Sequence, residues 1–345
     1  LGGDYFYSYR DIKEDFRKIQ STFSKYDSVV LNFEGALPSE SKEIRNKSVR
    51  LSVSKEAFCL PNNTIFSFAN NHISDFGSTG IEATLQETAI NNIKWFGLES
   101  YKQQYDNYII IEKNDIKICY VGFGWVNEEC VPSTKNTKGV VDFTRKNIDS
   151  VFNLLSNEEF DILICYVHSG YEYEYYPLPI HVGLSRYLID LGADIVYASH
   201  THCIQAYELY DESYIFYGLG NFYFSEFQKN YPVNCDLGLA LDITITESII
   251  SNINILSLQY DRKSNKTTII NNDSFLQLNQ LPIISLDEYS KNYRKIRTRK
   301  KNPRPIYYYN YDKINFLKYR IWLFFIKLTG ILRIRGVIKK LLGWA

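Results

Sequence analysis

Four of the five histidines in this chain stand where an apolar run gives way to polar residues. They are His72, His168, His200 and His202. The runs before them, residues 64–69, 162–167 and 194–197, are rich in β-branched and aromatic side chains, which is typical of buried strands. In open α/β sheets, ligand sites form at the carboxyl ends of the strands. We therefore expect these imidazoles to gather at one edge of a sheet.

The rest of the pattern alternates helices and strands up to about residue 200, after which strands dominate. Strands are expected at residues 1–6, 28–33, 64–69, 117–122, 161–167, 194–197 and 214–219, with an antiparallel pair at 237–246 and 249–260. Helices are expected at 11–25, 80–93, 146–155 and 180–191, a turn at 122–124, and a loop at 171–176. Asp4 would stand at the C-terminal tip of the first strand. This order predicts an α/β sandwich with mixed sheets.

Oxygen and imidazole groups at these strand ends suit divalent metals, which prefer such ligands. The candidates are Asp4, Glu34, Asn71, His168, His200 and His202. Glu34 would bridge two ions about 3.5–4 Å apart, and solvent between the ions would be the nucleophile because two cations stabilise hydroxide. The pattern therefore predicts a two-metal hydrolase, although each histidine alone is more often structural than a ligand.

His72 differs from the other strand-end histidines because Asp75 follows it three residues later. This pairing suits a general acid that a carboxylate holds and that protonates a leaving oxygen. We assign catalysis to His72 and Asp75, and substrate contacts to Asn32, Asn70, Glu172, Asn221 and His181. For His181, at the start of a predicted helix, a surface position is the alternative.

The six cysteines include no CxxC pair, and Cys119, Cys165 and Cys203 lie in or beside strand-like runs. We expect buried free thiols, which favours a reducing compartment. A disulfide framework or a thiolate zinc site is the alternative. The chain opens on Leu1 rather than methionine, so we expect the natural start to lie upstream. A cytoplasmic or peripheral cytoplasmic-face location is predicted, and an extracytoplasmic one stays open.

The C-terminal part is strongly basic although the whole chain has no formal net charge. Residues 291–345 contain 16 Lys and Arg and one Asp, a net charge of about +15. A basic, aromatic and aliphatic segment suits an anionic membrane surface or a synthase partner, and we assign this role to residues 294–345. A helix packed on the main domain is the alternative. Nucleic-acid binding is the weakest hypothesis because the aliphatic content is high, so no nucleic-acid partner is expected. No segment reaches the ~20 apolar residues that span a bilayer.

An ordered set of short motifs runs through residues 1–245. The motifs are Gly3-Asp4, Asn32-Phe33-Glu34, Ala69-Asn70-Asn71-His72 with Asp75 and Gly77, His168-Ser169-Gly170 with Glu172-Tyr173, Gly192-Ala193-Asp194, Ser199-His200-Thr201-His202 and Gly220-Asn221-Phe222. The set resembles the CapA family of bacterial capsule and poly-γ-glutamate synthesis proteins, which is related to calcineurin-like metallophosphoesterases.

The resemblance implies a four-layer α/β/β/α, metallo-dependent phosphatase-like fold for residues 1–270, followed by a basic extension at 271–345. It also implies that the six candidate ligands hold two divalent ions, Mn, Fe or Zn, and that His72 is the acid. The implied function is hydrolysis of a phosphoester, or of an amide or ester, in the synthesis of a cell-surface polymer. The implied partner is that polymer or its phosphorylated precursor.

Four departures from the family pattern bear on the metal and the substrate. Phe6 stands where phosphoesterases usually have a histidine, so one ion would be held weakly. Ser169 replaces a common tryptophan, His181 replaces glutamine, and Ser199 and Thr201 replace histidine and proline. A non-catalytic scaffold of a membrane-bound polymer synthase, which keeps the phosphatase fold, is therefore the alternative function.

Overall fold

The computed structural model describes residues 1–39, 47, 49–100, 107–225, 231–271, 280–281 and 284–298. Of the basic, aromatic segment predicted for membrane or synthase contact, residues 294–345, only 294–298 are described, and 299–345 lie outside the described residues. Their role and the division of the chain at residue 270 stay predictions.

The first sheet has five parallel strands in the order β11-β1-β2-β3-β4. Their bounds are β1 Asp4–Phe6, β2 Val29–Phe33, β3 Thr64–Ser67, β4 Lys94–Phe96 and β11 Asn221–Phe224. The helices of this half are α1 Glu14–Gln20 and α2 Gly77–Ile90, with short 3-10 helices at Phe23–Lys25 and Lys55–Phe58. Parallel strands buried on both faces read as continuous apolar runs, which is how β2 and β3 appear in the sequence.

The second sheet is mixed and has six strands in the order β5-β6-β7-β8-β10-β9, with β5 and β9 antiparallel to their neighbours. The bounds are β5 Tyr108–Lys113, β6 Ile116–Gly124, β7 Ile162–His168, β8 Ile195–Ser199, β9 Tyr207–Tyr210 and β10 Ser213–Phe216. The helices of this half are α3 Arg145–Leu155 and α4 Pro179–Asp190, with a 3-10 helix at Val126–Glu128. Helix α3 begins where the Thr144 side chain accepts a hydrogen bond from the Asn147 backbone N–H, a typical N-cap.

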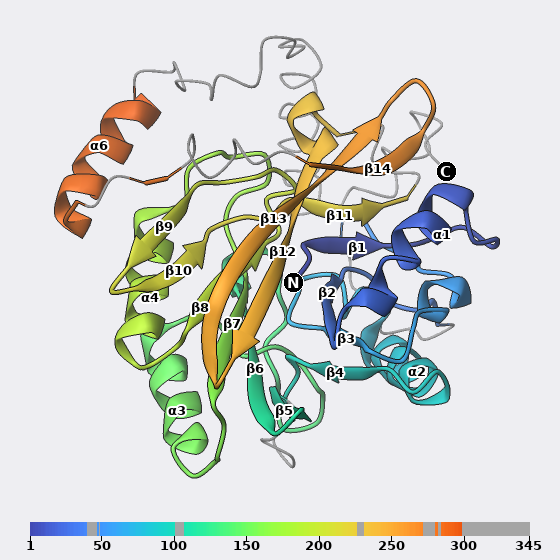
Figure 1. Ribbon diagram of the computed structural model, residues 1–345, viewed down its shortest axis with the longest axis horizontal. Coiled ribbons are helices and arrows are strands. Elements are labelled where there is room, and N and C mark those ends of the chain that lie inside the picture. The colour runs from blue at the N-terminus through green and yellow to red at the C-terminus, as the bar shows by residue number, and fades with distance from the viewer. Residues whose placement is uncertain are drawn as a thin grey trace.

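A third, antiparallel sheet in the order β12-β13-β14 crosses the face shown in Figure 1. Its strands are β12 Leu237–Thr246, β13 Ile249–Asp261 and β14 Lys266–Asn271, preceded by a 3-10 helix at Val233–Asp236. The predicted antiparallel pair is thus confirmed. Helix α6, Leu286–Thr298, lies against α4, and its Tyr289 hydroxyl donates to the carbonyl of Pro177, which precedes α4, at 2.9 Å.

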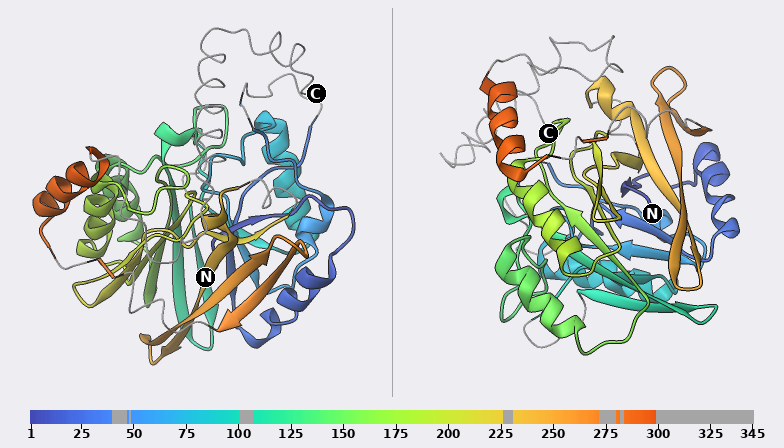
Figure 2. Two further views of the ribbon diagram at one scale, coloured as in Figure 1. Left: turned by 90° about the horizontal axis from the view of Figure 1, so that it is seen from above. Right: turned by 60° about the vertical axis from the view of Figure 1, so that its left-hand side comes forward.

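Three layers of buried side chains show that the molecule is a four-layer α/β/β/α sandwich, as predicted. One cluster packs β1, β2 and β3 against α1 and α2, and a second packs β6, β7 and β8 against α3 and α4. A third, which includes Val30, Tyr120 and Ile164, lies between the two sheets. Successive residues alternate between faces, so Leu31 turns to the helices while Val30 turns to the other sheet. Figure 2 shows the helix pairs on opposite outer sides of the sheets.

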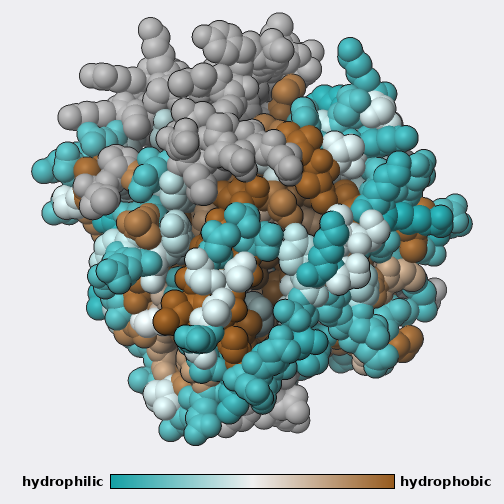
Figure 3. Space-filling view, viewed as in Figure 1, coloured by the Kyte–Doolittle hydropathy of each residue, from teal (hydrophilic) through white to brown (hydrophobic). Residues whose placement is uncertain are grey.

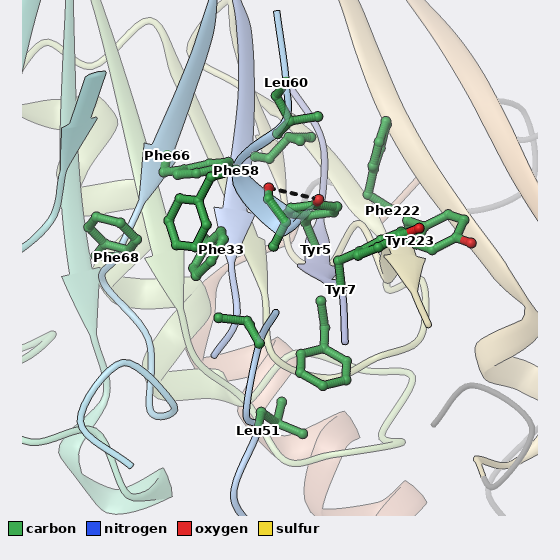
Figure 4. Close-up of a cluster of buried hydrophobic side chains, with 14 of the residues drawn as sticks. Tyr5, Tyr7, Phe33, Leu51, Phe58, Leu60, Phe66, Phe68, Phe222 and Tyr223 are labelled. Carbon is green, nitrogen blue, oxygen red and sulfur yellow. Dashed lines mark hydrogen bonds between the residues drawn. The ribbon is translucent and has the colours of Figure 1, made fainter. Parts of the chain in front are cut away.

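Aromatic rings fill much of the space between the first sheet and helices α1 and α2. Figure 4 shows the rings of Tyr5, Phe33 and Phe66 gathered with Phe58 and Phe68. The Phe33 and Phe66 ring centroids are 4.6 Å apart, and Tyr5 also donates a hydrogen bond of 3.0 Å to the Ala57 carbonyl. Buried rings of this size contribute large apolar area and a further ~0.5–1.5 kcal/mol per favourable ring pair. This packing fixes the strands whose ends carry the polar residues.

Some sequence predictions were wrong in detail. Strand β1 continues past Asp4 to Phe6, so Asp4 begins the strand, and a register shift follows it in the pairing with β11. Such an irregularity re-aims a side chain at a sheet edge. Residues 122–124 are not a turn, because β6 runs through Gly124. The helix predicted at 11–25 ends at Gln20 and resumes only as a 3-10 turn.

Gly122, within that strand, allows the two sheets to approach closely. A Cβ at this position would lie 2.9 Å from the Ala69 Cβ and 2.9 Å from the Gly97 Cα, closer than real Cβ contacts come. The glycine therefore lets β6 of the second sheet approach the chain that follows β3 and β4. This close approach brings the two sheets together beside the edge where the histidines lie.

At the opposite strand edge, apolar residues lie together with charged ones such as Lys25 and Asp242. A cavity of about 500 Å³ opens there, and its lining includes Val29, Ile118, Ile164, Leu241 and Ile243. In the view of Figure 3, which is that of Figure 1, apolar side chains lie in the middle of the molecule, among hydrophilic ones. None of the predicted metal ligands lines this cavity. Among the described helices, none has the length and hydropathy required to cross a bilayer.

None of the six cysteines, all of which lie in the described part of the chain, is in a disulfide, so the alternative of a disulfide framework was wrong. Five of them are buried, whereas Cys59 is exposed.

Candidate metal centre

The structure brings all six predicted ligands to one edge of the sandwich, between the two sheets. The first sheet and the loops after its strands supply Asp4, Glu34 and Asn71. The second sheet supplies His168 at the end of β7, and His200 and His202 in the loop after β8. None of the six is more than 4% exposed. The site is therefore a buried polar pocket formed by residues from distant parts of the chain.

Two groups of three side chains bring their ligand atoms within 4.8 Å of one another. We call Glu34, His168 and His200 the histidine-rich group, and Asp4, Glu34 and His202 the acidic group. Glu34 belongs to both, which is the geometry that a bridging carboxylate requires.

Glu34 is a fully buried carboxylate, and neither of its oxygens accepts a hydrogen bond from the described residues. Burial and the neighbouring Asp4 carboxylate raise its pKa well above the usual value. An isolated buried carboxylate costs several kcal/mol, and bound cations are among the ways proteins offset that cost. Both ring nitrogens of His200 also lack hydrogen-bond partners in the described part of the chain. These orphaned ligand atoms fit divalent cations.

Asp4 is held from two sides. Its Oδ1 accepts a hydrogen bond of 2.8 Å from Asn32 Nδ2, and its Oδ2 accepts one of 3.2 Å from the His200 backbone N–H. His202 Nδ1 lies 3.4 Å from the same Oδ2. Asp4 therefore ties the start of β1 to the loop after β8.

His168 faces Asn71 across the join between the sheets. Its Nε2 lies 2.9 Å from Asn71 Oδ1, and the Tyr166 hydroxyl lies 2.9 Å from its Nδ1. Burial, together with the neighbouring histidines His200 and His72, holds the pKa of His168 well below the usual value. His168 is therefore a neutral imidazole, the form that binds metals. Asn71 stands where it would add a fourth ligand to the histidine-rich group.

The loop that carries His200 and His202 is strained. Their φ angles are +98° and +54°, a region that non-glycine residues seldom adopt. Such conformations cost about 1–3 kcal/mol each and cluster at functional sites. The strain turns both side chains of the pair into the pocket beside Glu34, whose Oε1 lies 3.7 Å from His202 Nε2.

Contacts with residues outside the two groups also act on the rings of His200 and His202. His202 Nδ1 donates to Asn221 Oδ1 at 2.8 Å, which leaves Nε2 for a ligand. Tyr231 stacks on the His202 ring at a centroid distance of 4.7 Å. Burial alone would lower the pKa of His200, but Glu128, with Oε2 3.9 Å from His200 Nε2, outweighs it together with Glu172 and raises the pKa.

His72 and Asp75 form the predicted pair. His72 Nδ1 lies 2.7 Å from Asp75 Oδ2, and His72 Nε2 lies 3.8 Å from Glu34 Oε1. Burial alone would raise the pKa of Asp75, but His72 and Lys47 outweigh it and hold the pKa below its usual value. Asp75 is therefore a carboxylate, and Nδ1 must be the donor.

The residues predicted to contact substrate differ in their surroundings. Asn32 and Asn70 bond to one another and to protein groups, because Asn70 Nδ2 donates to Asn32 Oδ1 and its Oδ1 accepts from the His72 backbone N–H. Glu172, in the loop between β7 and α4, is partly exposed and lies near enough to raise the pKa of Glu34. Substrate contact by these residues and by Asn221 stays a prediction.

His181 is not on the surface, so the surface alternative was wrong. It is 3% exposed and packs edge-on against Trp125 at a centroid distance of 4.4 Å. Burial and the charge of nearby His200 lower its pKa to about 3. The helix places it beneath the site because Val182 and Ser185 share the buried face of α4.

Three residues at the site had no place in the sequence prediction: Lys47, Glu128 and Tyr166. For Tyr166 a signal existed, because it lies two residues before His168 on the same face of β7. Lys47 lies in a polar loop and Glu128 ends a short 3-10 helix, each among other charged residues, where nothing in the pattern distinguishes them.

Comparison with known proteins gives the family. A model described as bacterial capsule synthesis protein PGA_cap matches residues 3–226. The capsule biosynthesis protein CapA of Bacillus anthracis is 26% identical over 223 residues, which cover 61% of this chain and 54% of that protein. The PGA biosynthesis protein CapA of Bacillus subtilis (strain 168) is 30% identical over 216 residues, with coverages of 61% and 57%. The chain thus spans a little over half the length of these relatives.

Solved structures with similarity to this chain include three with low sequence identity. A hypothetical protein from Thermus thermophilus has a TM-score of 0.46 at 15% identity, covering 75% of this chain and 97% of that one. A phosphatase from Mycoplasma pneumoniae has a TM-score of 0.41 at 13% identity, with coverages of 80% and 94%. A 5′-nucleotidase from Candida albicans has a TM-score of 0.43 at 12% identity, with coverages of 83% and 51%.

The family match covers more than half of the chain, and the residues from Asp4 to Asn221 that form the pocket lie within it. The resemblance found in the sequence is therefore confirmed. The chain belongs to the bacterial capsule synthesis protein family, PGA_cap.

Proposed function

We propose that this domain is a metal-dependent hydrolase of the phosphoesterase type that acts in the synthesis of a capsule or another cell-surface polymer. The observation that carries the proposal is the pair of ligand groups that share Glu34, whose two oxygens are buried without a hydrogen-bond partner among the described residues. Bound cations would stabilise the ionised form of a carboxyl group in that position. The six ligands would hold two divalent ions, of which Mn, Fe and Zn suit imidazole and carboxylate.

Ions bound in the two groups would supply positive charge that activates water and stabilises charge on a phosphoryl oxygen. The protein residues perform the remaining work. Asn32 and the His200 backbone orient the Asp4 carboxylate, and Asn221 fixes the tautomer of His202. Tyr166 holds His168 from its Nδ1 side. The ligand atoms are thereby aimed before any ion binds, which reduces the reorganisation that binding requires.

His72 is the residue placed to move a proton. Asp75 accepts from its Nδ1, so Nε2 is the atom that faces the pocket beside Glu34. When protonated, Nε2 can donate to the oxygen of a leaving alcohol. Such proton transfer typically contributes ~10²–10⁴-fold to the rate. The demand for it is greatest when the leaving alkoxide is strongly basic.

The substrate that fits this chemistry is a phosphorylated precursor of the polymer, or the polymer itself. The relatives named for capsule and PGA biosynthesis support the cellular process. We further propose that residues 294–345 bring the domain to an anionic membrane surface or to a synthase partner.

The test combines metal analysis with two phosphodiester probes. Purified protein reconstituted with Mn²⁺ or Zn²⁺ should bind two ions per chain and hydrolyse bis(p-nitrophenyl) phosphate. Glu34→Gln should abolish both properties. His72→Ala should slow hydrolysis of an alkyl phosphodiester strongly and bis(p-nitrophenyl) phosphate little, because p-nitrophenolate leaves without a proton.

The scaffold function is the alternative, and Phe6 is the observation that favours it. Its ring packs against Phe224 at a centroid distance of 5.2 Å and offers no ligand atom to the acidic group. A protein that folds normally but binds no metal at millimolar concentration, and cleaves neither probe, would support the scaffold.

A further inference from the structure

Lys47 is a buried lysine beside the acid of the proposed reaction. Only 4% of its side chain is exposed, and its Nζ donates to Asp75 Oδ1 at 3.0 Å and to the Asn71 carbonyl at 2.9 Å. Glu129 Oε2 lies 3.7 Å from the same nitrogen. A buried ammonium group is costly unless it is paired and hydrogen-bonded. Here the buried ammonium group lies behind His72, on the side of Asp75.

The Asp75 carboxylate accepts three hydrogen bonds from the described residues. Its Oδ2 accepts from His72 Nδ1 at 2.7 Å and from the Leu51 backbone N–H at 2.8 Å. Its Oδ1 accepts the third bond, from Lys47. Without Lys47, no donor in the described part of the chain would fix that oxygen, and the carboxylate could rotate about the bond that joins it to the chain.

Lys47 Nζ also lies 3.4 Å from His72 Nδ1, but this contact is not a hydrogen bond. An ionised carboxylate only accepts hydrogen bonds, so Nδ1 must carry a hydrogen and donate it to Asp75. An ammonium group also only donates, so it cannot bond to a nitrogen that carries hydrogen. The lysine therefore hydrogen-bonds to Asp75 and not to His72, although burial and then its nearby charge lower the pKa of His72.

The bond to the Asn71 carbonyl gives Lys47 a second effect. Asn71 is the residue before His72, and its side chain faces His168 in the histidine-rich group. One ammonium group thus fixes the carboxylate behind the acid and the backbone that carries both the acid and a predicted ligand.

We propose that Lys47 is a positioning residue that sets the orientation of His72 through Asp75 and the Asn71 carbonyl, so that Nε2 is directed at the leaving oxygen of the substrate. The catalytic part of this inference rests on the proposed hydrolase function. The positional part concerns the His72 Nδ1–H bond and stands on the contacts alone.

The first experiment measures that bond without any activity. An imidazole N–H that donates to a carboxylate gives a far-downfield proton NMR signal, and His72→Ala identifies it in the zinc-loaded full chain. Lys47→Met should broaden this signal by solvent exchange or remove it. Lys47→Gln, which keeps a donor without the charge, should retain part of it and serves if the methionine variant folds poorly. Circular dichroism verifies folding.

The second experiment compares leaving groups. Lys47→Met should lower kcat for an alkyl phosphodiester by about 10–100-fold and change kcat for bis(p-nitrophenyl) phosphate by less than about twofold, because only the alkoxide needs the proton. A loss of packing alone would lower both rates together. KM should change little for either probe.

The matched control is Lys55→Met. Lys55 pairs with Glu87 at 3.1 Å on the surface of the same half, with 73% of its side chain exposed. The control should leave the signal and both rates unchanged. An unaltered His72 signal in Lys47→Met, or equal loss with both probes, would overturn the proposal. If the wild-type protein cleaves neither probe, the proposed function fails, and the NMR signal still decides whether Lys47 positions His72.

Discussion

The two ligand groups share Glu34 but differ in what surrounds them. Asn71 lies where it would add a fourth ligand to the histidine-rich group, and both nitrogens of His200 lack hydrogen-bond partners among the described residues. In the acidic group, Asp4 already accepts hydrogen bonds on both oxygens, and the ring of Phe6 packs on Phe224. A cation gains most where ligands are numerous and unpaired. The difference therefore predicts one strongly and one weakly held ion.

The largest effect is expected from Glu34→Gln, which removes the charge that both groups share. The affinity for both ions should fall by more than about 100-fold, beyond the 10–100-fold typical of residues that only orient a ligand. Mass spectrometry measures the bound metal, and titration calorimetry measures the two affinities. The metal-free variant should also be more stable than metal-free wild type, because folding no longer has to bury the Glu34 carboxyl group beside Asp4, at the cost of a buried charge or of proton uptake.

Glu128→Gln is the control for that change, because Glu128 lies beside His200 but belongs to neither group. It should bind two ions with affinities lowered by no more than about 100-fold. If Glu34→Gln kept both ions, Glu34 would not be the bridge and the two groups would have to be separated.

The next effect distinguishes the groups from one another. His168→Ala should remove the tightly held ion, whereas His202→Ala should remove the weakly held ion and leave one per chain. Calorimetric titration of each metal-free variant gives the number of sites and their affinities. Equal stoichiometry and affinity in the two variants would contradict the predicted difference, since the two groups would then be equivalent.

Phe6→His adds a ligand atom beside the acidic group and should reduce the difference in affinity between the two groups. The second affinity should rise by about 10-fold or more while the first stays constant. Stability of the metal-free protein should fall by about 1–3 kcal/mol, because a polar ring replaces Phe6 in a packed position. Phe6→Leu is the matched control: it should lose stability and leave both affinities unchanged.

The comparison also shows what the sequence could reveal. Histidines and carboxylates at the ends of apolar runs predicted the ligands, because parallel strand ends converge on one edge. Lys47 and Glu128 were missed because they reach the site from a loop and from a short 3-10 helix, where spacing along the chain carries no information about contact. The short strands β4 and β9 were missed for a related reason, since a few residues give no clear alternation. The order of elements predicted an α/β sandwich with mixed sheets, and the family resemblance implied its four layers.

The smallest effect on metal concerns His181, which lies near His200 but holds no predicted ion. Its folded pKa of about 3 lies below the value of 6.5 for an exposed histidine. The unfolded chain therefore binds the extra proton as pH falls below 6.5, and stability falls with it until the folded group protonates near pH 3. At pH 5 the loss relative to pH 7 is about 2 kcal/mol.

His181→Phe keeps a ring against Trp125 and removes the titration, so this part of the acid destabilisation should disappear. Urea unfolding of the metal-free protein at pH 7 and pH 5, with chelator present, measures the difference for variant and wild type. Other groups titrate in both proteins and cancel in the comparison. Metal affinities should stay within about twofold of wild type at pH 7, because no group includes His181. An unchanged pH slope would show that the imidazole is protonated in the fold, and a large loss of metal would place His181 among the residues that orient His200.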